Sequence, residues 1–167
     1  MNTPQENKEL IPSEEFIKQV LAGKVNEKIE ELEAELLTLE QVEMPVEHRF
    51  INGMYVREIT IPKGTILTGA VHKFDYVDIM LSGDIAVATP DGIKRFQGVN
   101  IMDGKAGRKR AGYAYEDTHW VTVHKTDESN PENIVKELTV RTMSEYKSLP
   151  ESNKQPSIET KGGPLCQ

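Results

Sequence analysis

Residues 46–124 carry short stretches in which apolar and polar side chains alternate, and this feature constrains the fold most. A period of two residues predicts β-strands, because successive side chains of a strand point to opposite faces of a sheet. Turn-forming residues such as Asn52-Gly53 and Asp103-Gly104 separate the stretches. Short strands that follow one another without a helix predict an antiparallel sandwich or barrel. The predicted strands are Val46–Ile51, Met54–Pro62, Thr65–His72, Tyr76–Ser82, Gly83–Thr89, Ile93–Phe96, Val99–Met102 and Thr118–His124.

A predicted amphipathic helix precedes the strands, over residues 13–42. Its apolar residues recur at steps of four and three, which places them on one face of an α-helix. Two interpretations of this face remain open: it packs on the protein's own strands, or it forms a short coiled coil between copies of the chain. Because an apolar face needs cover, we expect a homo-oligomer, either a dimer or a trimer. The residues of this face are Val25, Ile29, Leu32, Leu36 and Leu39.

The remaining segments flank the β-rich part, which we place at residues 46–126. A short C-terminal helical segment is predicted over residues 131–147, where Pro131–Leu138 is amphipathic. Residues 1–12 are polar, and residues 149–167 are polar and rich in proline, glycine and serine. We expect both ends to be disordered, because neither carries a periodic apolar pattern.

Composition excludes several classes of partner. The net charge of −7 argues against nucleic-acid binding, which requires a basic surface. No apolar stretch reaches the length of a membrane span, and the first residues do not resemble a signal peptide. Cys166 is the only cysteine, so no intrachain disulfide can form. We therefore expect a protein of the cytoplasm, with no nucleic-acid and no membrane partner.

Residues 64–83 have the spacing of a known metal-binding motif. Gly64 is followed by five residues, Ala70-Val71-His72, three residues, Tyr76, six residues and Gly83. These intervals resemble the first motif of the cupin family, and Lys105-Ala106-Gly107 with Arg110 resembles its second motif, with an arginine in place of the histidine. The resemblance implies a mainly β fold, an antiparallel cupin-type β-barrel (jelly roll), here with one N-terminal amphipathic helix and a short C-terminal helix.

The positions that hold the metal in that motif carry Ala70, His72, Tyr76 and Arg110. Zinc, iron and manganese sites need about three His or carboxylate ligands. A guanidinium repels a cation. We therefore expect no bound metal, no other cofactor and no assigned catalytic residue.

Longer stretches resemble small cupin-like proteins of tailed bacteriophages and prophages. The resemblance covers about residues 28–145 and is carried by YVREITIPKGTILTG and KRAGYAYEDTHWVTVH. It implies a phage origin, with the host cytoplasm or the virion as location, and it implies no reaction. Many of these relatives have histidine where this chain has Tyr76 and Tyr115, so no family-wide metal or acid/base role is implied here.

Cationic and aromatic residues gather near the motif positions and suit an anionic small molecule, nucleotide-like or a sugar phosphate. Guanidinium groups pair with phosphate or carboxylate, and aromatic faces stack on a base or sugar. For His72, a pocket group and a core histidine bonded to backbone remain open alternatives. Trp120 is interpreted as core or interface packing. The candidate ligand-binding residues are Arg57, His72, Tyr76, Lys109, Arg110, Tyr113, Asp117 and His124.

Three functional classes follow from these features. The first is a binding protein that captures an anionic small molecule and sequesters a host metabolite or signal. The second is a metal-independent sugar epimerase or isomerase, with His72 or His124 as base, Asp117 orienting it, and Tyr76 or Tyr113 as acid. The third is a structural or assembly component of the virion. The fold alone does not choose among them.

Overall fold

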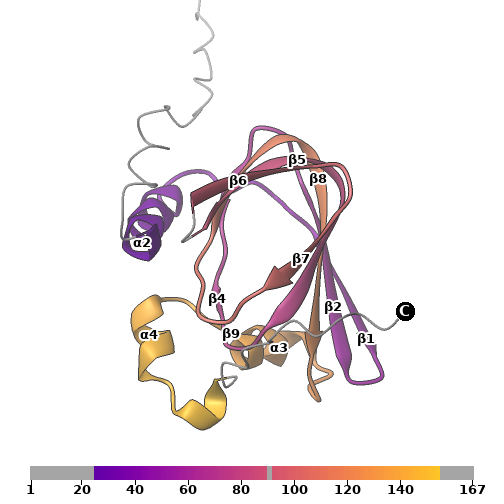
Figure 1. Ribbon diagram of the computed structural model, residues 1–167, viewed down its shortest axis with the longest axis vertical. Helices are drawn as coiled ribbons and strands as arrows, with labels where there is room; N and C mark the ends of the chain where they lie inside the picture. The colour runs from indigo at the N-terminus through magenta and orange to yellow at the C-terminus, as the bar shows by residue number, and fades with distance from the viewer. Residues whose placement is uncertain (1–24, 90–91, 155–167) are drawn as a thin grey trace, which may run out of the picture.

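The computed structural model describes residues 25–89 and 92–154 and consists mainly of antiparallel β-structure. Its strands are β1 (Val46–Ile51), β2 (Met54–Ile61), β3 (Ile66–Thr68), β4 (Val71–His72), β5 (Tyr76–Thr89), β6 (Gly92–Gln97), β7 (Asn100–Gly104), β8 (Ala111–Lys125) and β9 (Thr139–Val140). Figure 1 shows the main sheet curled around an interior, with helices outside it. The prediction of a mainly antiparallel β fold is confirmed.

Strand pairing does not close the sheet into a barrel. Among the described residues the order is β1-β2-β8-β5-β6, with β3 on β8 and β7 on β5, and β4 and β9 form a separate two-stranded sheet. The terminal strands β1 and β6 are not paired with each other. The expected closed barrel is therefore corrected to an open, curled sheet. The two long central strands β5 and β8 provide its curvature, and a bulge interrupts their register.

Residues 76–89, predicted as two strands, form the single strand β5. The register between β5 and β8 shifts around Ser82 and Asp84, and Gly83 between them has φ +114°. A Cβ at Gly83 would collide with Thr118 on β8, so glycine is required for the two strands to approach this closely. The predicted boundary between two strands at Gly83 is thus a β-bulge within one strand.

Strand β8 begins at Ala111, seven residues before the predicted start at Thr118. The added residues lacked the alternation of large apolar side chains. A Cβ at Gly112 would lie 3.2 Å from side-chain atoms of both Ile85 and Leu67, so only small residues fit against β5 and β3 here. The strand was predicted to start too late because the crowding by β3 and β5, which selects small residues here, is not visible in the local sequence pattern.

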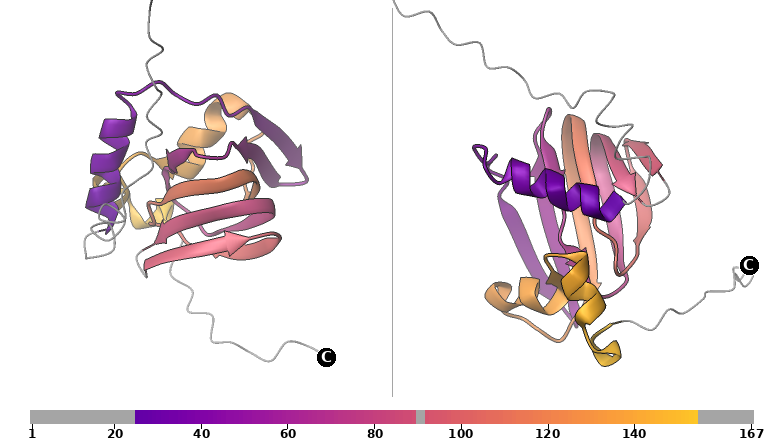
Figure 2. Two further views of the ribbon diagram at one scale, coloured as in Figure 1. Left: turned by 90° about the horizontal axis from the view of Figure 1, so that it is seen from above. Right: turned by 90° about the vertical axis from the view of Figure 1, so that its left-hand side faces the viewer.

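Helix α2 (Val25–Leu36) packs on the outside of the sheet, as the two views of Figure 2 show. Ile29 is fully buried and Leu32 nearly so, and both cluster with Ala88 of β5 and Ala111 of β8. Ile29 and Leu32 therefore pack on the protein's own sheet, whereas Leu39 of the predicted face lies beyond the end of α2 and is 45% exposed. The coiled-coil interpretation is not supported. The predicted first half of the helix, residues 13–24, lies outside the described residues. The dimer or trimer stays a prediction.

The C-terminal segment covers one end of the sheet. Helix α3 (Pro131–Leu138) is capped by the side chain of Asn130, which accepts a hydrogen bond from the backbone N–H of Glu132. It is followed by β9, helix α4 (Met143–Ser148) and the 3₁₀ helix η1 (Glu151–Asn153). Where one helical segment was expected, two helices flank a strand, because β9 pairs with β4. Figure 1 shows this segment beside β4, the strand that carries His72.

Candidate functional site

A cavity of about 140 Å³ lies inside the curl of the sheet, and we call it the inner cavity. Its wall comes from β2, β3, β4, β5 and β8, together with Gly69 and Arg110 from the adjoining loops. Side chains that alternate inward along these strands supply most of the lining. The lining residues with polar or charged side chains are Arg57, His72, Tyr76, Asp78, Arg110, Trp120 and Thr122.

Arg110 and Asp78 form a buried ion pair in this wall. Nη1 of Arg110 donates to Oδ2 of Asp78 at 2.5 Å. Oδ1 of Asp78 accepts from Nε1 of Trp120 at 2.9 Å and from Oγ1 of Thr122 at 3.2 Å. Asp78 is only 2% exposed, so this full set of donors offsets the cost of burying its charge. Nε of Arg110 is buried and has no hydrogen-bond partner in the described part of the chain.

Arg57, on β2, is the second guanidinium of the inner cavity. Burial lowers its pKa, and the nearby Tyr55 and Asp78 oppose that shift. Within residues 25–89 and 92–154, its side chain makes neither a hydrogen bond nor an ion pair. Arginine remains protonated in proteins, so Arg57 brings a positive charge with no bonded counter-ion into the wall.

Three aromatic rings stack beside these charged groups. The ring centres of His72 and Tyr76 are 4.0 Å apart, and His124 lies 4.9 Å from His72 and 4.8 Å from Tyr76. The guanidinium carbon of Arg110 is 5.5 Å from the centre of the Tyr76 ring, within cation–π range. The stack therefore holds His72 and Tyr76 against Arg110.

The stacked groups are uncharged at neutral pH. Burial, followed by the charges of His124, Arg110 and Arg57, lowers the pKa of His72 to about 3. Burial and the charge of Arg57 lower the pKa of His124 to about 4. Burial and the charge of Asp78 raise the pKa of Tyr76 above its usual value. The fixed charges of the cavity wall are consequently those of Arg57, Arg110 and Asp78.

Five of the eight sequence candidates meet at this place. Arg57, His72, Tyr76 and Arg110 line the inner cavity, and His124 stacks on two of them. The motif spacing had placed His72, Tyr76 and Arg110 at positions that face the interior of the β-structure. Of its two open interpretations, His72 has the position of the pocket group, since it lines the inner cavity. Its ring is mostly buried, but among the described residues Nδ1 has no hydrogen-bond partner and the ring makes no hydrogen bond to backbone.

Lys109 lies elsewhere, although it precedes Arg110 directly. Its side chain is fully buried on the outer side of the sheet, where Nζ donates to Oε2 of Glu33 at 2.9 Å. Nζ also donates to the carbonyl oxygens of Arg141 at 2.8 Å and Gly69 at 3.4 Å. Adjacent residues of an extended chain point to opposite sides, so Lys109 faces the outer side of the sheet and Arg110 faces the inner cavity.

Tyr113 and Asp117 also lie outside the inner cavity. Tyr113 lines a separate groove of about 540 Å³ between the end of α2 and residues 62–68. Asp117 is exposed, and its Oδ1 accepts a hydrogen bond from the backbone N–H of Lys63 at 2.8 Å. It stands seven residues before His124 on β8, roughly 20 Å along an extended strand, so it does not orient that imidazole.

Comparison with known proteins finds similar solved structures but does not assign the chain to a family. No protein-family model matches the chain, and no curated protein matches it. A conserved protein of unknown function from Streptococcus pyogenes is 20% identical with a TM-score of 0.43, covering 54% of this chain and 80% of its own. A cupin-2 domain containing protein from Shewanella frigidimarina is 14% identical with a TM-score of 0.41, covering 56% and 91%.

An RmlC-like cupin family protein with a double-stranded β-helix fold, from Methanocaldococcus jannaschii, is 14% identical with a TM-score of 0.43, covering 53% and 92%. These TM-scores are too low to carry an argument. The resemblance to cupins therefore rests on the residues of the motif.

Two further findings concern metals and membranes. In the described part of the chain, no group of three or more His, Cys, Asp or Glu side chains is arranged to hold a metal ion. None of the helices in that part is long and apolar enough to span a membrane.

Asp78, Trp120 and Thr122 are the polar cavity residues that the sequence analysis did not select as ligand-binding. Asp78 follows Tyr76 by two residues in the same strand, and Trp120 and Thr122 precede His124 by four and two residues. Period-two alternation from the selected residues would have placed all three on the inner face. Trp120 packs against the core, as interpreted, and also lines the cavity.

Proposed function

We propose that this protein binds a small organic anion in the inner cavity. One observation carries the proposal: Arg57 is a half-buried guanidinium that faces the cavity, and its side chain makes no ion pair and no hydrogen bond among the described residues. Keeping a desolvated charge unpaired is costly. A bound carboxylate or phosphate would supply the missing negative charge and accept hydrogen bonds from Arg57.

The charges of the wall favour an anion over a cation or a neutral ligand. Two guanidiniums face one carboxylate, and Arg110, Trp120 and Thr122 already donate to that carboxylate. One positive charge, that of Arg57, is left over. A charge-assisted hydrogen bond is worth about 1.5–3 kcal/mol, and one guanidinium can donate two of them to a carboxylate.

The same wall supports binding better than acid/base catalysis. A general base works best when its pKa lies near the operating pH. The pKa of His72 is lowered to about 3 and that of His124 to about 4, which makes both imidazoles weak bases. Asp117, the carboxylate expected to orient a catalytic histidine, lies at the far end of β8. The epimerase alternative therefore lacks its dyad.

The test is isothermal titration calorimetry with butanoate, inorganic phosphate and butanamide. We expect an anion to bind and the neutral amide of the same shape to bind at least about tenfold more weakly, since it cannot pair with Arg57. Arg57→Gln should lower anion affinity by a similar factor. Arg49→Gln is the matched control, because Arg49 is an exposed arginine that pairs with Glu47 and Glu58. Equal binding by wild type and Arg57→Gln would contradict the proposal.

The resemblance to phage proteins gives this proposal a setting. We propose that the protein acts in the cytoplasm of an infected bacterium, where it sequesters an anionic host metabolite or signal. Mass spectrometry of purified phage particles tests the setting. A stoichiometric amount of this chain in the particles would favour the structural-component alternative.

A further inference from the structure

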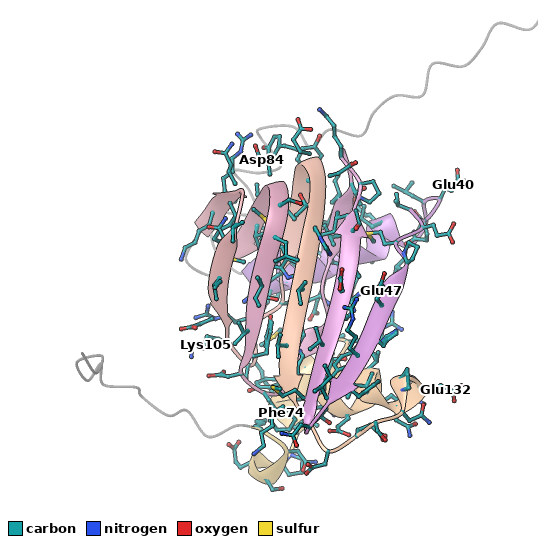
Figure 3. The ribbon with its side chains drawn as sticks, turned by 90° about the vertical axis from the view of Figure 1, so that its right-hand side faces the viewer. Glu40, Glu47, Phe74, Asp84, Lys105 and Glu132 are labelled. Carbon is teal, nitrogen blue, oxygen red and sulfur yellow. The ribbon has the colours of Figure 1, made fainter. Side chains whose placement is uncertain are left out.

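Polar and apolar groups occupy separate layers of the inner cavity. Strand register shows this arrangement, because Thr122 of β8 is paired with Arg57 on one side and with Asp78 on the other. These residues, together with Arg110, make up the polar layer. Figure 3 shows Phe74, just before β5, at one end of the sheet and Asp84 of the same strand at the other. The polar layer lies near the Phe74 end of β5.

The apolar layer begins one step further along the strands. Ile59 of β2 and Met80 of β5 are both paired with Trp120 of β8, and beyond them Ile61 continues the inward face of β2. Past the bulge, Ile85 and Val87 of β5 lie opposite Ala114 and Gly112 of β8. The apolar side chains of this layer that line the inner cavity are Ile59, Ile61, Leu67, Ile85 and Val87.

The apolar layer has little hydrogen-bonding capacity to offer a ligand. Nε1 of Trp120 already donates to Asp78 at 2.9 Å. The backbone at Gly69 is likewise occupied, since its N–H donates to the carbonyl of Arg110 at 2.9 Å. A ligand hydroxyl in this layer would lose its bonds to water and gain none, which costs binding free energy.

The size of the inner cavity favours a small ligand. Its volume of about 140 Å³ is well below the roughly 300 Å³ at which drug-sized pockets begin. A small anion is therefore enough to fill it.

Resting on the proposed function, we infer that the ligand is a small monocarboxylate with a short hydrocarbon body. Its carboxylate pairs with Arg57 in the polar layer, which balances the single excess positive charge. Its hydrocarbon body lies against Ile59, Ile85 and Val87. This ligand is smaller and less polar than the nucleotide-like or sugar-phosphate ligand expected from the sequence.

Calorimetry with three probes tests this ligand class: 3-methylbutanoate, glycerate and glycerol 3-phosphate. Glycerate has the same number of heavy atoms as 3-methylbutanoate and the same charge, but it carries two hydroxyl groups. We expect 3-methylbutanoate to bind at least about tenfold tighter than glycerate, and glycerol 3-phosphate to bind more weakly than either.

A pair of variants checks where the hydrocarbon lies. Val87→Thr places a hydroxyl in the apolar layer with little change in volume, so it should reduce the preference for 3-methylbutanoate over glycerate by about fivefold. Val77→Thr is the matched control on the same strand, since Val77 is 39% exposed and Tyr76 and Asp78 beside it face inward. The control should keep the wild-type preference.

The outcomes separate the two proposals. If glycerate or glycerol 3-phosphate binds as tightly as 3-methylbutanoate, and Arg57→Gln weakens it, the monocarboxylate inference is wrong and the anion site stands. If none of the three anions binds, both are wrong. If Val87→Thr does not fold, the wild-type comparison of the three probes still decides the ligand class.

Discussion

Nη1 of Arg110 lies 2.5 Å from Oδ2 of Asp78, and this pair joins the segment before β8 to the inner face of β5. A buried carboxylate that loses its charge leaves the guanidinium beside it unpaired. The Arg110–Asp78 pair therefore contributes both to folding stability and to the charge of the candidate site. A change to Asp78 should affect stability and anion binding in opposite directions.

Asp78→Asn should destabilise the protein by about 3 kcal/mol, because Arg110 loses its buried counter-ion. Anion affinity should rise about tenfold, because the polar layer then holds two unbalanced positive charges. Chemical denaturation with and without butanoate measures both effects. Glu116→Gln is the control: its pair with Lys63 is about 60% exposed at both ends, so its loss should cost less than about 1 kcal/mol. Weaker anion binding by Asp78→Asn would argue against the charge balance proposed for the site.

Stability should fall as the pH is lowered from about 6.5 towards 4. The pKa of His72 is lowered to about 3 and that of His124 to about 4 in the folded protein, whereas the unfolded value is about 6.5. In this window the unfolded chain binds protons that the folded chain does not, so lower pH favours unfolding. Each histidine contributes a slope of up to about 1.4 kcal/mol per pH unit.

His124→Asn should flatten this pH dependence, as measured by urea denaturation at several pH values. His119→Gln is the control, since it leaves both stacked histidines in place; His119 lies in the same strand and pairs with Glu58 on the other face of the sheet. An equally steep dependence in His124→Asn would mean that other groups cause the acid sensitivity.

Lys109 should hold helix α2 and the C-terminal segment onto the sheet. Its Nζ donates to Glu33 of α2 and to the carbonyl of Arg141 between β9 and α4. Lys109→Met should cost about 3 kcal/mol and increase hydrogen exchange in both segments, because it leaves Glu33 without its buried partner. Lys105→Met is the control, since Lys105 and its partner Asp75 are 40% and 37% exposed. Unchanged exchange in α2 would show that Lys109 does not fasten the helix.

Some of the residues that face the inner cavity could be predicted from the sequence, because side chains alternate between the two faces of a strand. His72, Tyr76 and Arg110 meet because the motif spacing fixes the face of each residue. The separation of Lys109 from Arg110 could not be predicted, since it depends on where the loop before β8 becomes extended. The surface on which Ile29 packs could not be predicted either, because an apolar helix face can pack on a sheet as well as on another helix. The inward position of Asp78 could also have been predicted, because it follows Tyr76 by two residues in β5 and so points to the same face.

Replacing Leu32 distinguishes packing on the sheet from self-association. Leu32 is 8% exposed and clusters with Ile29 and Ala88. Leu32→Ala should lower stability by roughly 2–4 kcal/mol through the cavity it creates, without a change in molecular mass by light scattering. Leu37→Ala, at a position 56% exposed, should change neither. A mass that falls in Leu32→Ala alone would assign this face to the predicted dimer or trimer.

Gly104 should be required for the aromatic stack. It ends β7 opposite Tyr76, and a Cβ at this position would collide with the Tyr76 ring. Gly104→Ala should push that ring away from His72 and Arg110, lower stability by about 1–3 kcal/mol and weaken anion binding, because Arg110 loses the surface that holds it. Near-UV circular dichroism and calorimetry report the two effects. Gly98→Asn is the control, since no atom lies within 4 Å of a Cβ there and asparagine tolerates its φ of +66°. An unchanged aromatic signal in Gly104→Ala would mean that Tyr76 is not held between β7 and His72.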